Sequence, residues 1–126
     1  MASNIKEAYE QTNIQAKMIE LVSFNVASID LLCYLSLFEG ECLNTLKLVN
    51  LGLKDDHVKE IVEWIGVMKV ERLVLTCNRL TDNCLPLFTG RALPYLKEIY
   101  LGRNRINKYR MRENIIELRG KFILYL

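Results

Sequence analysis

The sequence LKEIYLGRNRI, at residues 96–106, decides the fold of this 126-residue chain. Its apolar residues and its single Asn follow the pattern L-x-x-L-x-L-x-x-N-x-L, with Ile at two of the Leu positions. Residues 70–80, VERLVLTCNRL, repeat the same frame with Val at the first position. Two matches to one frame indicate an internal repeat, a feature that determines the architecture of any chain that has it.

Two weaker copies of the frame precede these. Residues 43–53 read LNTLKLVNLGL, with Leu51 at the Asn position, and residues 16–26 read AKMIELVSFNV, with Phe24 there. The copies are 27, 27 and 26 residues apart, counted at the fourth position of the frame. That position holds an aliphatic residue in every copy: Ile19, Leu46, Leu73 and Ile99. A nearly constant period in four copies predicts a stack of similar structural units.

The pattern and its period resemble those of leucine-rich-repeat proteins, and the ribonuclease-inhibitor type most, over residues 16–126. The resemblance implies about four repeats plus a terminal strand, and residues 1–15 are expected to form an N-terminal capping helix. The implied fold class is α/β: a right-handed solenoid with a short curved parallel sheet of about five strands on its concave side and helices on its convex side. The resemblance further implies a binding role, usually toward another protein.

Side-chain alternation supports the strands without the resemblance. Inward apolar residues alternate with outward ones in four short segments, as in strands with one buried face: residues 18–22, 45–49, 72–76 and 98–102. Phe122–Leu126 is expected to add a fifth strand, paired in parallel with Glu98–Gly102. An exposed edge on the strand over residues 122–126 would invite a second copy, a strand from a partner, or further repeats of a longer array.

Segments with helical periodicity follow the strands. Ser28 is expected to open the first helix, and Asp55 or Asp56 to cap one that runs toward Met68. A last helix is expected over Lys108–Gly120. This last helix should bury four apolar residues: Met111, Ile115, Ile116 and Leu118.

The Asn positions of the frame lie in the turns after the strands. Asn78 and Asn104 are expected to bond the turn backbone from inside, as the family resemblance implies. Where Leu51 and Phe24 stand instead, the backbone groups need water or a neighbouring part of the chain as partners.

Composition and hydropathy restrict the class of protein. With 51% hydrophobic and 25% charged residues, and only 6 Gly and 2 Pro, the chain is neither disordered nor collagen-like. It has no run of about 18 apolar residues, and its start lacks the basic-then-apolar order of a signal peptide. The sequence therefore predicts one domain without a membrane span, in the cytoplasm or the nucleus.

Charge is distributed unevenly along the chain, although the formal net charge is only +2. Residues 1–63 carry 5 basic and 10 acidic side chains, whereas residues 64–126 carry 12 basic and 5 acidic ones. Seven basic side chains crowd the end of the chain: Arg103, Arg105, Lys108, Arg110, Arg112, Arg119 and Lys121. Such a segment is typical either of a solvated helix surface or of a site for an acidic partner, nucleic acid included.

Signatures of catalysis are absent from the sequence, among them phosphate-binding glycine loops, dinucleotide fingerprints, nucleophile elbows and zinc-protease motifs. The only histidine, His57, is expected to lie exposed at a helix start, and Cys77, without a nearby histidine, to be a structural thiol. The four Cys have no C-x-x-C spacing, which favours free buried thiols over a zinc site or disulfides. The chain is therefore expected to be no enzyme and to hold no cofactor or metal.

Candidate binding residues are those that the frame places on the concave face of the sheet, between the inward apolar positions. The expected cross-strand columns set Glu20 beside Lys47 and Arg72 beside Glu98, two pairs of opposite charge. The predicted protein-binding site comprises Val49, Arg72, Val74, Tyr100 and Arg103. Tyr and Arg are enriched where binding energy concentrates, although Val and Tyr also favour strands intrinsically. Trp64 is expected to pack against the core, with a contact on the convex face as the alternative.

These surfaces lead to three functional hypotheses. The leading one is a non-catalytic protein-interaction module that displays a small concave leucine-rich-repeat surface to a protein partner. The alternative is an RNA- or ribonucleoprotein-associated factor, for example ribosome-bound, that uses residues 103–121. Its expected contacts to nucleic acid or another acidic partner are Arg105, Lys108, Arg110 and Arg112. A regulatory or inhibitory subunit that covers an enzyme site is the third hypothesis, which the resemblance allows.

Overall fold

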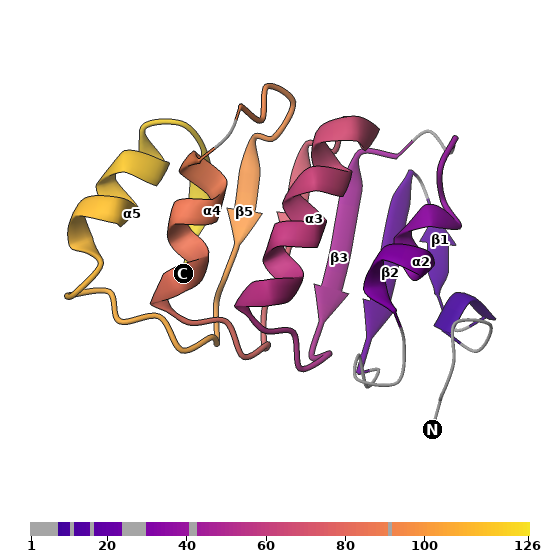
Figure 1. The fold of residues 1–126 in the computed structure, drawn as a ribbon, viewed down its shortest axis with the longest axis horizontal. Helices are drawn as coiled ribbons and strands as arrows, with labels where there is room; N and C mark the ends of the chain where they lie inside the picture. The colour runs from indigo at the N-terminus through magenta and orange to yellow at the C-terminus, as the bar shows by residue number, and fades with distance from the viewer. Residues whose placement is uncertain (1–7, 11, 16, 24–29, 41–42, 91) are drawn as a thin grey trace.

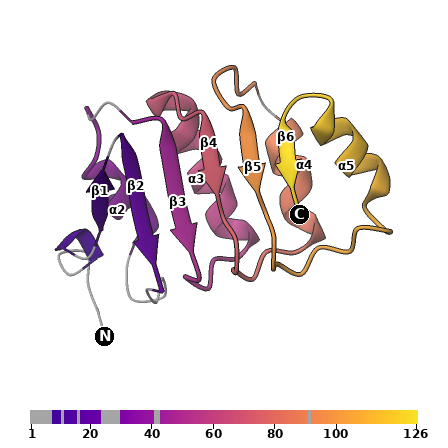
Figure 2. The same ribbon diagram turned by 180° about the vertical axis from the view of Figure 1, so that it is seen from behind.

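The fold alternates strands and helices along the chain, as the sequence predicts. It is seen in a computed structural model that describes residues 8–10, 12–15, 17–23, 30–40, 43–90 and 92–126. In this part of the chain six strands form one sheet: β1 (Asn13–Gln15), β2 (Met18–Val22), β3 (Thr45–Val49), β4 (Arg72–Val74), β5 (Glu98–Tyr100) and β6 (Ile123–Tyr125). The order of the strands across the sheet is their order along the chain (Figures 1 and 2).

Helical segments lie between the strands. They are α2 (Leu31–Ser36), α3 (Asp55–Met68), the short 3₁₀ helix η2 (Asp82–Cys84), α4 (Leu85–Thr89) and α5 (Arg112–Arg119). The four α-helices cover one face of the sheet (Figure 1), and the opposite face is seen without them when the molecule is turned (Figure 2). The described chain is thus an α/β structure of two layers, which confirms the expected fold class at this level.

Strands β2 to β6 are all parallel, and their pairing follows the repeat. The fourth position of the frame forms a single row across the sheet: Ile19, Leu46, Leu73, Ile99 and Leu124. The register predicted from the sequence is therefore confirmed, and so is the parallel strand predicted within Phe122–Leu126.

Strand β1 has no counterpart in the sequence prediction. It pairs with β2 in the antiparallel direction, with Ile14 opposite Ile19. The capping helix expected over residues 1–15 is therefore wrong for Asn13–Gln15, which are extended. Residues 8–10 are helical, and residues 1–7 and 11 lie outside the described part of the chain.

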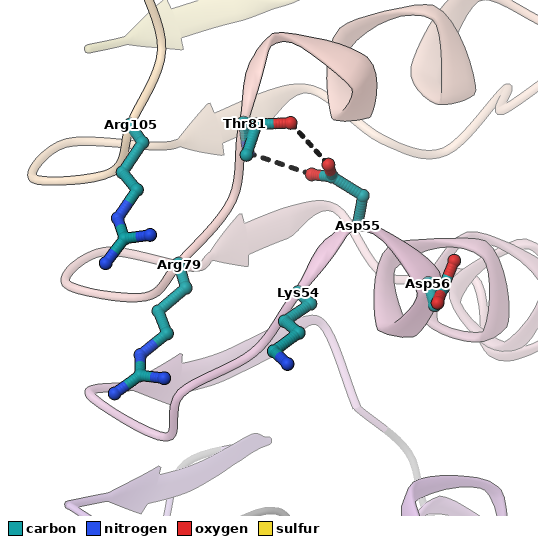
Figure 3. A pocket seen from close by; sticks show the side chains of 6 residues that line it. All are labelled: Lys54, Asp55, Asp56, Arg79, Thr81 and Arg105. Atoms are coloured by element: carbon teal, nitrogen blue, oxygen red, sulfur yellow. Dashed lines mark hydrogen bonds between the residues drawn. The ribbon is translucent and has the colours of Figure 1, made fainter.

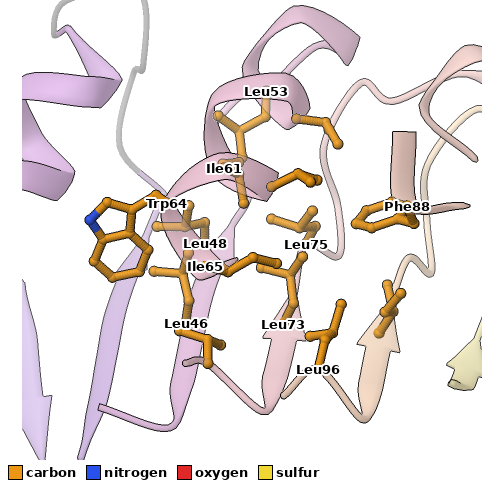
Figure 4. Packing of buried hydrophobic residues seen from close by; sticks show 14 of the residues in the cluster. Leu46, Leu48, Leu53, Ile61, Trp64, Ile65, Leu73, Leu75, Phe88 and Leu96 are labelled. Atoms are coloured by element: carbon orange, nitrogen blue, oxygen red, sulfur yellow. The ribbon is translucent and has the colours of Figure 1, made fainter. Parts of the chain in front are cut away.

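The core lies between the sheet and the helix layer. Figure 4 shows its packing, with Leu46, Leu48 and Leu73 from the sheet, Leu75 just after β4, Ile61 and Ile65 from α3, and Phe88 from α4. Trp64 of α3 is also buried, and its Nε1 donates to the backbone oxygen of Leu35 at 3.1 Å. The packing interpretation of Trp64 is confirmed, since its one polar atom already has a partner inside the protein.

A residue in the left-handed conformation follows each of the strands β2, β3, β4 and β5, although residues other than glycine seldom adopt this conformation. These residues are Ser23, Asn50, Cys77 and Arg103, with φ angles of 56°, 56°, 59° and 56°. Their spacing of 27, 27 and 26 residues is the spacing of the sequence repeat, so each copy of the frame places a left-handed residue at the same position.

Asn78 bonds the backbone of its own turn and of the preceding one. Its Oδ1 accepts from the N–H of Leu51 at 2.9 Å and of Leu53 at 3.2 Å. Its Nδ2 donates to the backbone oxygens of Leu48 and Leu75, at 2.9 Å each. The turn in which Leu51 replaces Asn is therefore satisfied by the neighbouring repeat, one of the two alternatives expected from the sequence.

Asn104 makes the equivalent bonds one repeat later. Its Oδ1 accepts from the N–H of Leu80 at 3.0 Å, and its Nδ2 donates to the backbone oxygens of Leu75 and Leu101 at 3.0 Å each. The expected role of both Asn side chains is confirmed.

The cap of α3 differs from the predicted one. Lys54, rather than Asp55 or Asp56, is the N-cap residue, and its backbone N–H donates to Nδ1 of His57 at 2.9 Å. Asp55 instead accepts from the backbone N–H of Thr81 at 2.9 Å and from the hydroxyl of the same residue. The start of α3 lies against the next turn. The carboxylate of Asp55 therefore connects two repeats instead of capping α3.

The last helix is shorter than predicted. It begins at Arg112 and not at Lys108, and within it Ile115 and Leu118 are buried. Ile116, expected in the core, is 61% exposed. Residues three apart share a helix face, whereas adjacent ones do not. Because Ile115 and Leu118 are buried on one face, Ile116 points toward solvent.

Asp30 caps α2 by accepting from the N–H of Cys33 at 3.3 Å, whereas the predicted opening residue Ser28 lies outside the described part.

The cysteines occupy different environments. Cys33 is exposed, so the expectation of a buried thiol is wrong there. Cys84 is buried, and burial raises the pKa of its thiol to about 12. Cys42 lies outside the described residues.

Candidate functional site

The sheet face opposite the helices is the first candidate surface. The predicted site residues Val49 and Val74 lie partly buried on it, in β3 and β4. One cross-strand row on this face comprises Glu20, Lys47, Val74, Tyr100 and Tyr125. The expected ion pair between Lys47 and Glu20 forms, with Nζ and Oε2 3.0 Å apart. Exposed pairs of this kind add little stability, so this one chiefly keeps the face polar at its β2 end.

A cluster of four side chains lies on the same face where it is formed by β4, β5 and β6. We call it the Tyr100 cluster; its members are Arg72, Glu98, Tyr100 and Tyr125. Nε and Nη2 of Arg72 both donate to Oε2 of Glu98, at 3.1 and 2.9 Å. The hydroxyl of Tyr100 donates to Oε1 of that carboxylate at 2.9 Å. The rings of Tyr100 and Tyr125 are stacked, with centroids 4.3 Å apart and an interplanar angle of 9°.

Glu98 thus joins two of the predicted site residues into one unit. Donation from Arg72 and then from Tyr100 lowers the pKa of Glu98, and the hydrogen bond to Glu98 raises the pKa of the Arg72 guanidinium. The same carboxylate raises the pKa of Tyr100 to about 12. At neutral pH the cluster therefore holds a carboxylate between a cation and a neutral phenol.

Replacing Glu98 by glutamine should lower the pKa of Tyr100 from about 12 toward its usual value of about 10, because the charge that favours the neutral phenol is removed. Phenolate absorbance measured against pH reports this shift. Tyr34, whose pKa is raised by burial to about 12, remains as a late-titrating group in both proteins. Glu20→Gln, on the same face but paired with Lys47, is the control and should leave the titration unchanged.

The sign of the accompanying stability change follows from the raised pKa of Tyr100. A group whose pKa is higher in the folded state stabilises the fold fully below its unfolded pKa, which is about 10 for a tyrosine. This contribution is lost as the pH rises through the folded value of about 12.

A titration curve of Glu98→Gln that coincides with the wild-type curve would show that the hydrogen bond between Tyr100 and Glu98 does not form in solution.

Arg103 lies apart from the Tyr100 cluster. It follows β5 in a left-handed turn, and its side chain is exposed. We call the edge of the sheet formed by the turns after β3, β4 and β5 the turn edge. The structure therefore groups Arg103 with the turn edge rather than with Arg72, which begins β4 at the other end of the strands.

A shallow hollow of about 410 Å³ lies on the turn edge (Figure 3). It is lined by six residues from the start of α3 and from the turns after β3, β4 and β5: Lys54, Asp55, Asp56, Arg79, Thr81 and Arg105. Arg105 is among the predicted contacts of an acidic partner, but Lys54 and Arg79 are not, because they are distant in sequence. A signal for Arg79 is nonetheless present, since Arg79 and Arg105 each follow the Asn of the repeat frame.

The basic segment over residues 103–121 does not form one surface. Three predicted contacts lie at the turn edge, before α5 or at its first residue: Lys108, Arg110 and Arg112. Arg119 is the last residue of α5, and Lys121 lies between α5 and β6. The N–H of Ile123, which begins β6, donates to the backbone oxygen of Lys97 at 2.8 Å. That bond places this end of the segment at the opposite edge of the sheet, where the strands begin.

Tyr125 is a candidate site residue that the predicted protein-binding site does not include. Its signal was the alternation within Phe122–Leu126, where the buried residues are Phe122 and Leu124. Extending the frame by one strand places Tyr125 beside Tyr100, as the observed register does.

Within the described residues, no group of three or more His, Cys, Asp or Glu side chains is placed to hold a metal ion. Among the helices described, none combines the length and the apolar character needed to cross a bilayer. No model of a known protein family matches the chain, and no curated protein matches it either. The interactions that the open sheet face and the turn edge offer are hydrogen bonding, aromatic stacking, apolar contact and charge.

Proposed function

We propose that the chain is a leucine-rich-repeat protein of the ribonuclease-inhibitor type, folded as a right-handed solenoid, that acts as a non-catalytic protein-interaction module. Three features with the same period support the repeat interpretation. They are the in-register parallel strands, the left-handed residue that opens each turn, and the Asn side chain that bonds two successive turns. In repeat proteins of this kind each unit contacts only its neighbours, and the stacked strands form one continuous surface.

The open face of the sheet is the proposed binding surface. The helices lie on the other side (Figures 1 and 2), so a partner reaches this face without displacing them. Apolar and aromatic side chains are exposed on it: Val22, Ile123 and Tyr125. At a strand spacing of about 4.8 Å, five parallel strands are only about 19 Å wide, which suits a helix, a tail or a small epitope of a partner protein.

The Tyr100 cluster is the observation that carries this proposal. Tyr and Arg contribute much of the binding energy at protein interfaces. Here the bonds to Glu98 and the stack on Tyr125 fix the side chains of Arg72 and Tyr100 before any partner arrives. Less side-chain entropy is then lost on binding.

Replacing Arg72, Tyr100 or Tyr125 by alanine should weaken binding of the partner at least about fivefold, or over about 1 kcal/mol. The melting temperature should change little, because all three side chains point away from the core. The measurement is capture of proteins from a nuclease-treated native extract on the immobilised wild-type and variant chains, with each captured protein quantified.

Tyr95→Ala is the matched control for this experiment. Tyr95 is 44% exposed and Tyr125 is 45% exposed, but Tyr95 lies near Lys69, whose Nζ is 5.5 Å from the ring centroid. A protein that binds wild type and Tyr95→Ala but not the three face variants is the expected partner. If every captured protein is retained by all three variants, the open face is not the binding surface.

A further inference from the structure

A row of three cations runs along the turn edge, and the proposed protein-binding face does not use it. Figure 3 shows Lys54, Arg79 and Arg105 in succession, with their charged groups pointing to the same side. They come from the turns after β3, β4 and β5 respectively. All three are exposed and line the hollow of about 410 Å³.

Hydrogen bonds between successive turns fix the spacing of the backbone segments that carry this cation row. The N–H of Arg79 donates to the backbone oxygen of Leu53 at 2.8 Å, and that of Arg105 to Leu80 at 2.7 Å. Chain segments bonded in this way lie about 4.7–4.9 Å apart, as neighbouring strands do. Like charges carried on neighbouring segments repel, so a ligand with several negative groups in line would stabilise the row.

Asp55 and Asp56 also line the hollow, but neither forms an ion pair with the cation row. Asp55 is engaged by the backbone N–H and the hydroxyl of Thr81. The carboxylate of Asp56 lies away from the three cations in Figure 3. Among the residues that the structure describes, none of the salt bridges includes a cation of the row.

An exposed aromatic ring follows Arg105 four residues later, in the next turn of the chain. Tyr109 is 95% exposed, yet the backbone that carries it is held in place. Oδ1 of Asn107 accepts from the N–H of Tyr109 at 3.1 Å and of Arg110 at 3.0 Å. The N–H of Asn107 in turn donates to Oδ1 of Asp82 at 2.7 Å. A fixed turn thus presents an almost fully accessible ring on the chain segment that follows the cation row.

We propose that the turn edge binds a single-stranded nucleic acid, with its phosphates on the cation row and one of its bases stacked on Tyr109. Guanidinium groups match the geometry of phosphate oxygens and can donate two hydrogen bonds to one phosphate. A positively charged track with an aromatic platform is the usual composition of a single-strand site. The proposal goes beyond the protein-interaction function, because no residue of the Tyr100 cluster takes part.

The ring of Tyr109 distinguishes this ligand from an acidic peptide. A row of cations alone would serve carboxylates as well as phosphates. Every nucleic-acid base has a face on which an aromatic ring can stack, whereas Asp and Glu side chains have none. Nucleic acid is therefore the polyanion that uses both the row and the ring.

Fluorescence anisotropy with a labelled single-stranded RNA of about 12 nucleotides tests the proposal, at salt concentrations from about 50 to about 200 mM. Single-stranded DNA of the same sequence and polyglutamate of equal charge are the comparison probes. Arg79→Ala and Arg105→Ala should each reduce the slope of log affinity against log salt by about 0.7. Tyr109→Ala should weaken RNA binding at least about fivefold and leave that slope unchanged.

Arg119→Ala is the matched control, since it removes an exposed arginine from the opposite edge of the sheet; affinity and slope should stay as in wild type. No binding of RNA or DNA at about 50 mM salt would overturn the proposal. Equal losses in Arg119→Ala and Arg79→Ala would do so too, because attraction would then be unspecific. If polyglutamate binds as tightly as RNA and Tyr109→Ala affects neither, the edge is a site for acidic peptides instead. Tyr100→Ala should not alter RNA binding, so this test and that of the protein-binding face fail separately.

Discussion

Replacing Leu73 by alanine should lower the free energy of unfolding by about 2–5 kcal/mol, because truncating a fully buried leucine removes apolar contacts and leaves a cavity. Leu73 has 0% of its surface exposed. It lies between Leu46 on β3 and Ile99 on β5. Backbone hydrogen bonds of the sheet hold both neighbours in place, so the cavity cannot close easily. Urea denaturation followed by circular dichroism measures the change.

Val67→Ala is the control for Leu73→Ala. Val67 lies on α3 but is 78% exposed, so its truncation should change the free energy of unfolding by less than about 0.5 kcal/mol. Similar stabilities of the two variants would contradict the assignment of the fourth frame position to the core.

Replacing Asn78 by alanine should lower the free energy of unfolding by about 2–6 kcal/mol. The N–H groups of Leu51 and Leu53 would lose their common acceptor in a buried turn, and each buried group left without a partner costs about 1–3 kcal/mol. The backbone oxygen of Leu75 is spared, because Asn104 also donates to it. Urea denaturation again provides the measurement, and the m-value of the variant should equal that of the wild type.

Asn104→Ala tests the same role of an Asn side chain at a turn where it accepts from fewer backbone N–H groups. Oδ1 of Asn104 accepts from a single N–H, that of Leu80, in a partly buried turn. Its loss should cost about 1–3 kcal/mol, less than the loss of Asn78. Equal or reversed effects of the two variants would mean that the shared acceptor is not what stabilises the turns.

The strand register was predictable from the sequence because it depends on a local rule that recurs. Side chains alternate between the two faces of a strand, so one aliphatic row through Leu73 and Ile99 fixes every neighbour across the sheet. Strand β1 obeys no such repeat: it is short, precedes the first copy of the frame and pairs in the antiparallel direction. The role of Asp55 was equally inaccessible, because its partner Thr81 is 26 residues away.

The candidate sites, too, could be predicted only in part from the sequence. The basic residues near the end of the chain are contiguous in sequence, but α5 carries the chain from the turn edge to the opposite edge, about 12 Å for its eight residues. Arg119 is thereby separated from Arg105. Conversely, the sheet register aligns Lys54 and Arg79 with Arg105, although whole helices separate them in sequence.

Each strand of the described sheet pairs only with the strands directly before and after it in the chain. Local opening then starts at the outer strands and proceeds inward, since losing an outer unit breaks contacts with one neighbour alone. The Tyr100 cluster spans β4, β5 and β6, so a partner seated across it would hold these units together. Binding at that face would therefore slow amide hydrogen exchange in β5 and β6 while leaving β2 unaffected.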